Sequence, residues 1–586
     1  MDSIRRDVFW VVAVLCYVMI LCRVRNVRCS PPGSVVECSS ASNNCTVQNG
    51  YGVFPDRTIC KAAQVVFPST EDELLASVAM AVVKKQKMRV VTRYSHSIPK
   101  LVCPGGDSGL VISTRDLDHV VSVDTSAMRM SFESGVPLRK LVDEAAKAGL
   151  ALPHCPFWEG VTVGGMLGTG AHGSSLFGKG SAVHEYVVGM RLVVPASQEE
   201  GYAKVILLTE DDEDLNAAKV SLGVLGVTSQ VTLQLQPLFK RSITNLEKGD
   251  LDVENMVLTF GLQHEFGGIS WYPSQGKAVY RVDDRVPMTV PGNGINDFTG
   301  FQPFFTSLLR TIRETEETEE ETSCVDCLCV FSELQVAVIL GLGRGLKNIG
   351  EHFLGYPVIG FQDKMQTSGS CLASPEDKLL TACPWDPRVK GQFFHQIGVS
   401  IGLSRIRDFL LDVKNLRDMD PKSFCGVELY DGILIRYVKA SSAYLGKEED
   451  SVDMDITFYR SHNPNIPALY TDVIQEIEQM AFFKYRGVPH WGKNRNVAFV
   501  GAIQKQRKAE EFRMVMKKYD AEGFFSNEWT DAVLGIRNQD IVIYKDGCAL
   551  EGLCVCSEDA HCAPQYGYLC TSGRVFTDAR VCRKQD

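Results

Sequence analysis

The spacing of apolar residues between positions 64 and 92 predicts a strand, a helix and a second strand. Residues 64–68 form a short apolar run bounded by proline, which is typical of a strand. Ser69 or Thr70 can cap the helix that follows, because acidic residues stand three positions on and leucines and valines recur at helical spacing to about Lys84. Residues 87–92 form the second strand, so this segment predicts a β-α-β unit.

The same pattern continues along the chain and predicts an α+β protein. Short strands are expected at 110–113, 120–123, 188–194 and 227–235, with a helix from about 137 to 149. Farther on, strands are expected at 427–438 and 454–459 and a helix at 469–483. Single hydrophobic cores stop growing at about 250 to 300 residues, so a chain of 586 residues predicts two large units. We place them at 57–239 and 240–545.

Composition and charge narrow the functional classes. A hydrophobic content of 45% and a charged content of 23% are those of a folded protein. The formal net charge of -10 provides no broad positive field that would collect phosphates, so we expect no nucleic-acid partner. Small-molecule chemistry remains open.

The first 29 residues predict a targeting segment. An apolar run from Val8 to Cys22 follows a basic start and precedes three further arginines. Its length favours a cleaved signal peptide, whereas the basic residues behind it resemble a stop signal, so a retained membrane anchor is the alternative. The first interpretation predicts the secretory pathway, with an extracellular or vacuolar protein; the second predicts a membrane-anchored one.

The cysteines indicate an oxidising compartment. The chain has 20 of them, and six crowd residues 546–586. A short segment of this kind is typical of a small disulfide-bonded module. Zinc is the alternative, but the Cys-x-x-Cys spacing of structural zinc sites is missing there. Cys324 and Cys327 have that spacing and lack the second pair, so we expect no metal site.

Two motifs indicate a ligand site in the first unit. His96 and Ser97 follow the second strand of the β-α-β unit, and strand ends are where such folds carry ligand loops. A glycine-rich segment matches the dinucleotide fingerprint literally, but no acidic residue follows about 20 positions later, which argues against a Rossmann fold. Its backbone could still approach a diphosphate closely. The candidate residues of this segment are Gly164, Gly165, Gly168, Thr169, Gly170, His172, Gly173 and Ser174.

A third motif, Pro-His-Trp-Gly-Lys at 489–493, lies near the end of the second unit. The charge of Lys493 could stabilise an anion that forms during hydride transfer, and His490 could orient or deprotonate a hydroxyl group. The structural alternative is a tryptophan packed in a core beside two polar residues.

Together these motifs resemble the aldonolactone oxidoreductases of the vanillyl-alcohol-oxidase-type FAD family, in particular the plant gulonolactone oxidases. The resemblance implies a two-part PCMH-type FAD-binding domain, an α+β cap domain that forms the substrate pocket, and, outside the family pattern, the Cys-rich tail. It implies that His96 binds the flavin, covalently in members that keep this histidine, and that Arg436 joins His490 and Lys493 at the substrate. Where relatives carry a glutamate two residues before that arginine, this chain has Leu434.

The implied reaction is oxidation of L-gulono-1,4-lactone or a related aldonolactone by hydride transfer to FAD, giving L-ascorbate. Molecular oxygen is the expected acceptor, which would yield hydrogen peroxide; a carrier protein or cytochrome is the alternative. Two other hypotheses stay open. One is an FAD enzyme for another sugar or alcohol, which the loss of the glutamate favours, and the other is a secreted binding protein that has lost catalysis.

Overall fold

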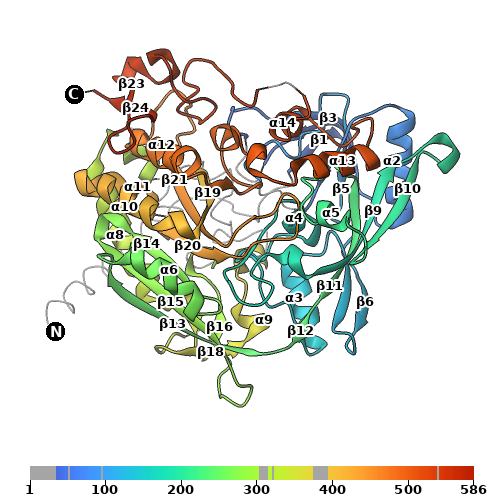
Figure 1. Ribbon diagram of the computed structural model, residues 1–586, viewed down its shortest axis with the longest axis horizontal. Helices are drawn as coiled ribbons and strands as arrows, with labels where there is room; N and C mark the ends of the chain where they lie inside the picture. The colour runs from blue at the N-terminus through green and yellow to red at the C-terminus, as the bar shows by residue number, and fades with distance from the viewer. Residues whose placement is uncertain are drawn as a thin grey trace.

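The computed structural model describes residues 35–49, 53–93, 97–302, 315–319, 322–350, 352–373, 394–429, 431–537 and 540–585. The predicted targeting segment and His96 lie outside the described residues. No helix in the described part of the chain is long and apolar enough to cross a membrane. The fold is mixed α+β, as predicted, with three large sheets (Figure 1).

The first sheet contains the predicted β-α-β unit. Strands β3 (Cys60–Val66) and β4 (Met88–Val91) both pair in parallel with β5 (Leu110–Ser113), and helix α2 (Glu71–Val83) connects them. The hydroxyl of Thr70 caps α2 by accepting from the backbone N–H of Glu73 at 3.2 Å. The hairpin β1 (Val36–Ser40) and β2 (Asn43–Val47) completes the order β1-β2-β3-β5-β4.

The second sheet, in the order β10-β9-β11-β7-β6, carries the helix that the sequence predicts near residue 140. That helix is α3 (Leu138–Lys147), which buries Leu138, Leu141 and Val142 against the sheet. The strands are β6 (Val120–Asp124), β7 (Arg129–Glu133), β9 (Val187–Pro195), β10 (Ala203–Thr209) and β11 (Val227–Gln234), and the short elements α5 (Leu215–Ala218), β8 (Leu150–Ala151) and β12 (Gln236–Pro237) lie beside them.

The second unit is built on an eight-stranded sheet in the order β18-β13-β15-β14-β20-β21-β19-β22, drawn green to orange in Figure 1. The strands are β13 (Lys240–Gly249), β14 (Gly268–Tyr272), β15 (Lys277–Val286), β18 (Val358–Phe361), β19 (Phe394–Gly402), β20 (Ile433–Val438), β21 (Ser451–Tyr459) and β22 (Val488–Pro489). Helices α6 (Val253–Gln263), α8 (Val325–Gly341), α9 (Gln362–Met365), α10 (Leu403–Met419), α11 (Cys425–Glu428) and α12 (Thr471–Gln479) accompany it, with the short pair β16 (Ile295–Asn296) and β17 (Leu346–Lys347).

One predicted strand of this sheet starts too early. The apolar pattern predicts a strand over 427–438, but Cys425–Glu428 forms helix α11 and β20 begins at Ile433. A disulfide joins Cys425, the first residue of the helix, to Cys329, and the left-handed backbone of Gly432 at φ +71° lies between the helix and the strand. Neither constraint is visible in hydrophobic periodicity.

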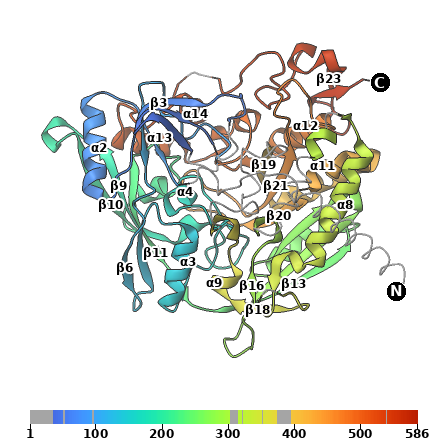
Figure 2. The same cartoon turned by 180° about the vertical axis from the view of Figure 1, so that it is seen from behind.

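Residues near 500–534 return to the first unit, although the sequence analysis assigns them to the second. Helices α13 (Ala509–Tyr519) and α14 (Glu528–Val533) place Phe512, Val515 and Trp529 in the same core as Leu233 of β11. Figures 1 and 2 both show the two helices beside the blue strands of the first sheet. The apolar faces of these two helices therefore pack in the core of the first unit.

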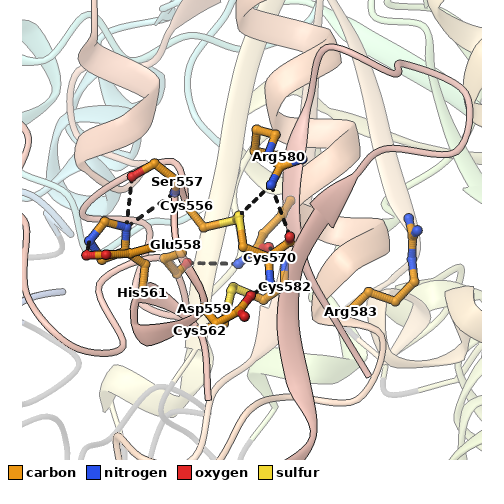
Figure 3. The surroundings of a disulfide bond; sticks show 12 residues. Cys556, Ser557, Glu558, Asp559, His561, Cys562, Cys570, Arg580, Cys582 and Arg583 are labelled. Atoms are coloured by element: carbon orange, nitrogen blue, oxygen red, sulfur yellow. Dashed lines mark hydrogen bonds and ion pairs between the residues drawn. A yellow bond between two sulfur atoms is a disulfide. The ribbon is translucent and has the colours of Figure 1, made fainter. Parts of the chain in front are cut away.

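The tail forms the predicted disulfide-bonded module around hairpin β23 (Tyr568–Ser572) and β24 (Arg580–Lys584). Its bonds are Cys548–Cys554, Cys556–Cys570 and Cys562–Cys582, and Figure 3 shows the surroundings of one of these bonds. Because all six sulfurs are bonded in pairs, none is a thiolate ligand for the alternative zinc site. Cys324 and Cys327 are also joined to each other.

The tail packs against helix α12, and Figures 1 and 2 both show the two side by side. Gln475 accepts from the backbone N–H of Cys582 at 2.7 Å, and Gln479 accepts from that of Arg580 at 3.0 Å. Between them, Glu476 accepts from three successive N–H groups of residues 574–576. The polar face of this helix is therefore bonded to the chain's own tail.

Candidate active site

A cavity of about 340 Å³ lies between the glycine-rich segment and the eight-stranded sheet. It brings together most of the residues that the sequence analysis selected from three distant motifs. Those that line it are Ser97, Gly164, Gly165, Gly168, Thr169 and His172 from the first unit, and Arg436, His490 and Lys493 from the second.

The glycine-rich segment begins as a short helix rather than as the expected irregular loop. Helix α4 (Val163–Gly168) starts at Thr162, whose hydroxyl accepts from the N–H of Gly165 at 3.3 Å. A Cβ at Gly164 would lie 3.1 Å from the Cβ of Ser134, and one at Gly165 would lie 3.2 Å from the Thr162 hydroxyl. The glycines therefore allow α4 to pack closely at the cavity wall.

Gly170, Gly173 and Ser174 do not line this cavity, although the sequence analysis included them as cofactor-binding residues. Gly170 turns the chain at φ +71°, and a Cβ at Gly173 would lie 2.9 Å from a backbone carbonyl. The Ser174 hydroxyl accepts from the N–H of Tyr437 at 3.0 Å and donates to the carbonyl of Gly267. Ser174 therefore connects the glycine-rich segment to the cap, whereas the two glycines shape the turn within the first unit.

Arg436 of β20, which lines the cavity, is paired with two carboxylates of the neighbouring strand β21. Asp453 lies opposite Arg436 in the register of the two strands, and Asp455 lies opposite Leu434. Arg436 pairs with Asp453 at 3.1 Å and also with Asp455. A carboxylate on the neighbouring strand therefore stands opposite the position where the family's glutamate is replaced by leucine.

The turn at 490–494 brings Lys493 to the same carboxylate, with Lys493 Nζ 2.5 Å from Asp455 Oδ1. Gly398 on β19 permits this approach, because a Cβ there would lie 2.9 Å from the Lys493 side chain. The carbonyl of Gly398 accepts from the N–H of His490 at 2.9 Å, and Asn494 bonds both backbone groups of Gly398. Sheet and turn are thus held in one fixed arrangement.

His490 is neutral and oriented as a hydrogen-bond donor. Burial lowers the pKa of His490 well below its ordinary value, and the nearby charge of Lys493 lowers it further. Its Nδ1 accepts from the N–H of Gly492 at 3.1 Å, so the ring proton is on Nε2. The neighbouring Trp491 is buried in the core of the first unit and donates to the carbonyl of Leu445 at 2.8 Å. Of the residues in this motif, Trp491 therefore has the packing role that was the structural alternative.

His172 has the opposite orientation. Its Nδ1 lies 2.9 Å from the carbonyl of Gly173 and must donate to it, so Nε2 is the ring nitrogen that faces away from this carbonyl. That Nε2 lies 3.4 Å from Asp453 Oδ2. Burial alone would raise the pKa of Asp453, but the charges of His172, Arg436 and Lys447 hold it well below the ordinary value. A proton arriving on His172 would therefore face an ionised carboxylate.

The sequence analysis missed both aspartates of β21, together with Gln396, which lines the cavity and donates to Thr457 at 3.1 Å. It also missed Lys447, whose pKa burial lowers to about 8. Two aspartates separated by one residue within an apolar strand are a detectable signal, because side chains two apart lie on one face of the sheet.

Comparison with known proteins agrees with this arrangement. An FAD binding domain model matches residues 62–198, a D-arabinono-1,4-lactone oxidase model matches 393–533, and a model of the L-gulonolactone oxidase 2-like C-terminal domain matches 545–584. L-gulonolactone oxidases 5 and 2 of Arabidopsis thaliana are each 54% identical over 95% of this chain, covering 95% and 94% of their own lengths. This chain belongs to the L-gulonolactone oxidase family. It is therefore an FAD-dependent oxidoreductase that acts on CH–OH groups.

Two further similarities are more distant. An L-gulono-1,4-lactone dehydrogenase of Mycobacterium tuberculosis is 23% identical over 82% of this chain and 98% of its own. The solved structure of a solvent-stable cholesterol oxidase has a TM-score of 0.64 at 14% identity, covering 86% of this chain and 99% of its own. The latter shows a shared fold.

The cavity has the polar groups that a flavin cofactor would need. Among the described residues, the Ser134 hydroxyl, His172 Nε2 and Arg436 Nε are buried at the cavity wall without a hydrogen-bond partner. Buried polar groups are normally bonded, so these three atoms indicate a polar ligand. The glycines of α4 supply close backbone approach beside Ser134. The residues present therefore fit FAD.

Proposed function

We propose that this protein oxidises L-gulono-1,4-lactone, or a closely related aldonolactone, to the enediol lactone L-ascorbate. The observation that carries the proposal is the cluster of Arg436 and Lys493 on Asp455 at the wall of the cavity. Two fixed cations beside a neutral donor histidine suit a substrate that is rich in oxygen atoms. The names of the Arabidopsis relatives support the same substrate.

Each residue then has one task. Arg436 and Lys493 hold the lactone oxygens and stabilise the negative charge that develops there. His490 donates from Nε2 to a substrate oxygen, and His172 Nε2 accepts the proton of the reacting hydroxyl. FAD, when bound, supplies the hydride acceptor.

The position of Asp455 supports a lactone, rather than another sugar or an alcohol, as the substrate. The missing glutamate at Leu434 was the main argument for a different substrate. Asp455 stands directly opposite that position on the adjacent strand and lines the same cavity. A carboxylate therefore remains available to orient Arg436 and Lys493.

The first experiment is anaerobic addition of L-gulono-1,4-lactone to the purified yellow protein. We expect loss of the flavin absorption, followed by its return on admission of air together with one hydrogen peroxide per lactone oxidised. Oxygen as acceptor is part of the proposal, and a bleached enzyme that recovers only with cytochrome c would replace it by a dehydrogenase. If an alditol bleaches the flavin and lactones do not, the proposed substrate is wrong.

Covalent attachment of FAD through His96 is also proposed. The support is that Ser97, the next residue, lines the cavity. We expect acid precipitation to leave yellow colour in the pellet of the native protein and none in the pellet of His96→Ala. His119→Ala is the matched control, because that side chain is 70% exposed. Acid-stable flavin in the His96 variant would refute the attachment.

We further propose that the protein enters the secretory pathway and functions outside the cell or in the vacuole. Seven disulfides between described cysteines support this, since such bonds persist in oxidising compartments. N-terminal sequencing of the mature protein distinguishes a cleaved signal peptide from a retained anchor, which would place the enzyme on a membrane.

A further inference from the structure

A second, much smaller cavity adjoins the active site behind His172. Its volume of about 10 Å³ is at the lower limit of what can hold one water molecule. His172 and His490 line both cavities, and His184 lines only the small one. The small cavity therefore lies between the active-site histidines and a third buried histidine that the proposed reaction does not use.

His184 is held in one tautomer by a chain of hydrogen bonds. The hydroxyl of Ser441 donates to Glu185 Oε1 at 2.8 Å, so it must accept the bond of 2.7 Å from His184 Nε2. The proton of the neutral ring is therefore on Nε2. His184 Nδ1, the remaining basic nitrogen, is buried and has no hydrogen-bond partner among the described residues.

The outer end of this series of hydrogen bonds, Glu185, lies at the protein surface. Glu185 is part of the wall of an open pocket of about 410 Å³, and its side chain is 14% exposed. Four further carboxylates line the same pocket, at Glu210, Asp211, Asp212 and Glu213. Carboxylates at a surface exchange protons readily with water, so the chain ends at a suitable donor and acceptor group.

We propose that His172, His184, Ser441 and Glu185 form a proton path between the active site and this surface pocket. The inference rests on the proposed function in one respect, that a hydroxyl proton is released at His172. Oxidation of the alcohol gives a carbonyl, a hydride on the flavin and that proton. Reoxidation by oxygen takes up one proton to complete hydrogen peroxide, so the path carries one proton out and one back per turnover.

Each proposed step joins side chains that line the same small cavity or are hydrogen-bonded to each other. A proton from His172 crosses the small cavity to His184 Nδ1, while His184 Nε2 releases its own proton to Ser441 and Ser441 releases its proton to Glu185. Burial lowers the pKa of His184 to about 4, so the ring is neutral at rest and is protonated only in transit. Burial raises the pKa of Glu185, but the hydrogen bonds from Ser441 and the Ser442 N–H and the charge of Lys219 act against it, and the net pKa lies below the ordinary value.

Two adjacent serines allow a matched test. Ser441 and Ser442 both donate to Glu185 Oε1, at 2.8 and 3.1 Å, but only Ser441 also bonds His184. The probe is laser-flash reduction of the bound FAD by a photoexcited deazaflavin, with a pH-indicator dye in weakly buffered solution. The readout is proton uptake from solvent, which needs no lactone.

We expect proton uptake to keep pace with flavin reduction in the native protein and in Ser442→Ala. In Ser441→Ala the rate of proton uptake should be at least tenfold lower than the rate of flavin reduction. Added imidazole should restore the rate of uptake. Equal uptake in the two serine variants would overturn the path. Should Ser441→Ala bind FAD poorly, Glu185→Gln preserves the side-chain shape, and uptake as fast as in the native protein would equally overturn it.

The failure of the path and the failure of the proposed function are separable. Normal proton uptake that depends on Ser441, with no bleaching by any lactone, would support the path and refute the substrate. Bleaching by the lactone, with uptake unaffected in both Ser441→Ala and Glu185→Gln, would refute the path alone.

Discussion

Replacing Lys493 by alanine should lower kcat by about 10²- to 10³-fold, the usual effect of removing a group that stabilises developing charge. Its Nζ lies 2.5 Å from Asp455 at the cavity wall, where charge would develop as hydride leaves the substrate. The FAD content, measured from the visible spectrum of the purified variant, should stay within about a factor of two.

Lys505 provides the control for a purely structural effect. It is half-buried and donates to the carbonyls of Phe482 and Gly487 at 3.0 and 2.8 Å, and it does not line the cavity. Lys505→Ala should lower the melting temperature without a comparable loss of kcat. An equal loss of FAD and turnover in the Lys493 variant would instead assign Lys493 a structural role.

The second large effect is expected on stability, from replacing Glu551 in the tail by alanine. Glu551 is 3% exposed and pairs with Arg57 of the first unit at 2.8 Å and with Arg460 of the second at 2.7 Å. Its other oxygen lies 3.4 Å from His395. Removing the carboxylate leaves buried cations uncompensated, so urea unfolding should show a loss of about 3–5 kcal/mol.

Glu558→Ala is the matched control, because the Glu558 side chain is 68% exposed in the same module (Figure 3). Its unfolding midpoint should stay close to that of the native protein. Burial raises the pKa of Glu551, but the charge of Arg460, then His395 and Arg57, lower it well below the ordinary value. The stability that it contributes is therefore present at neutral pH and is lost as the pH falls below the ordinary glutamate range. A variant as stable as the Glu558 control would refute this role.

These contacts give the tail a role within the molecule. Glu551 connects both large units, and Glu476 of α12 binds successive N–H groups of the tail. The tail therefore joins the two large units.

Local elements were predictable because local interactions decide them. The helix at 71–83 has its cap and its apolar spacing in one stretch of sequence, and β5 begins and ends where its apolar run does. The motifs at 164–172 and 490–493 were selected through the resemblance to a known family, because their spacing alone left a structural alternative open. Their residues meet at one cavity.

Errors arose where a distant residue sets the local structure. The strand predicted to begin at 427 begins at Ile433, and the short helix before it starts at Cys425, which is bonded to Cys329, almost a hundred residues away. Ser174 serves the contact with the cap rather than the cavity, since Tyr437 and Gly267 reach it only in the folded chain.

The sequence by itself determined the α+β class, the disulfide-bonded tail, the FAD-type glycine segment and the residues His490 and Lys493, because each depends on patterns within short segments. Only the tertiary structure decided that Asp455 lies opposite Leu434 on the adjacent strand, that Nδ1 donates in His172 and accepts in His490, and that His184 is connected to Glu185 through Ser441. Strand register, ring tautomers and burial depend on which distant groups meet, and no local pattern encodes that.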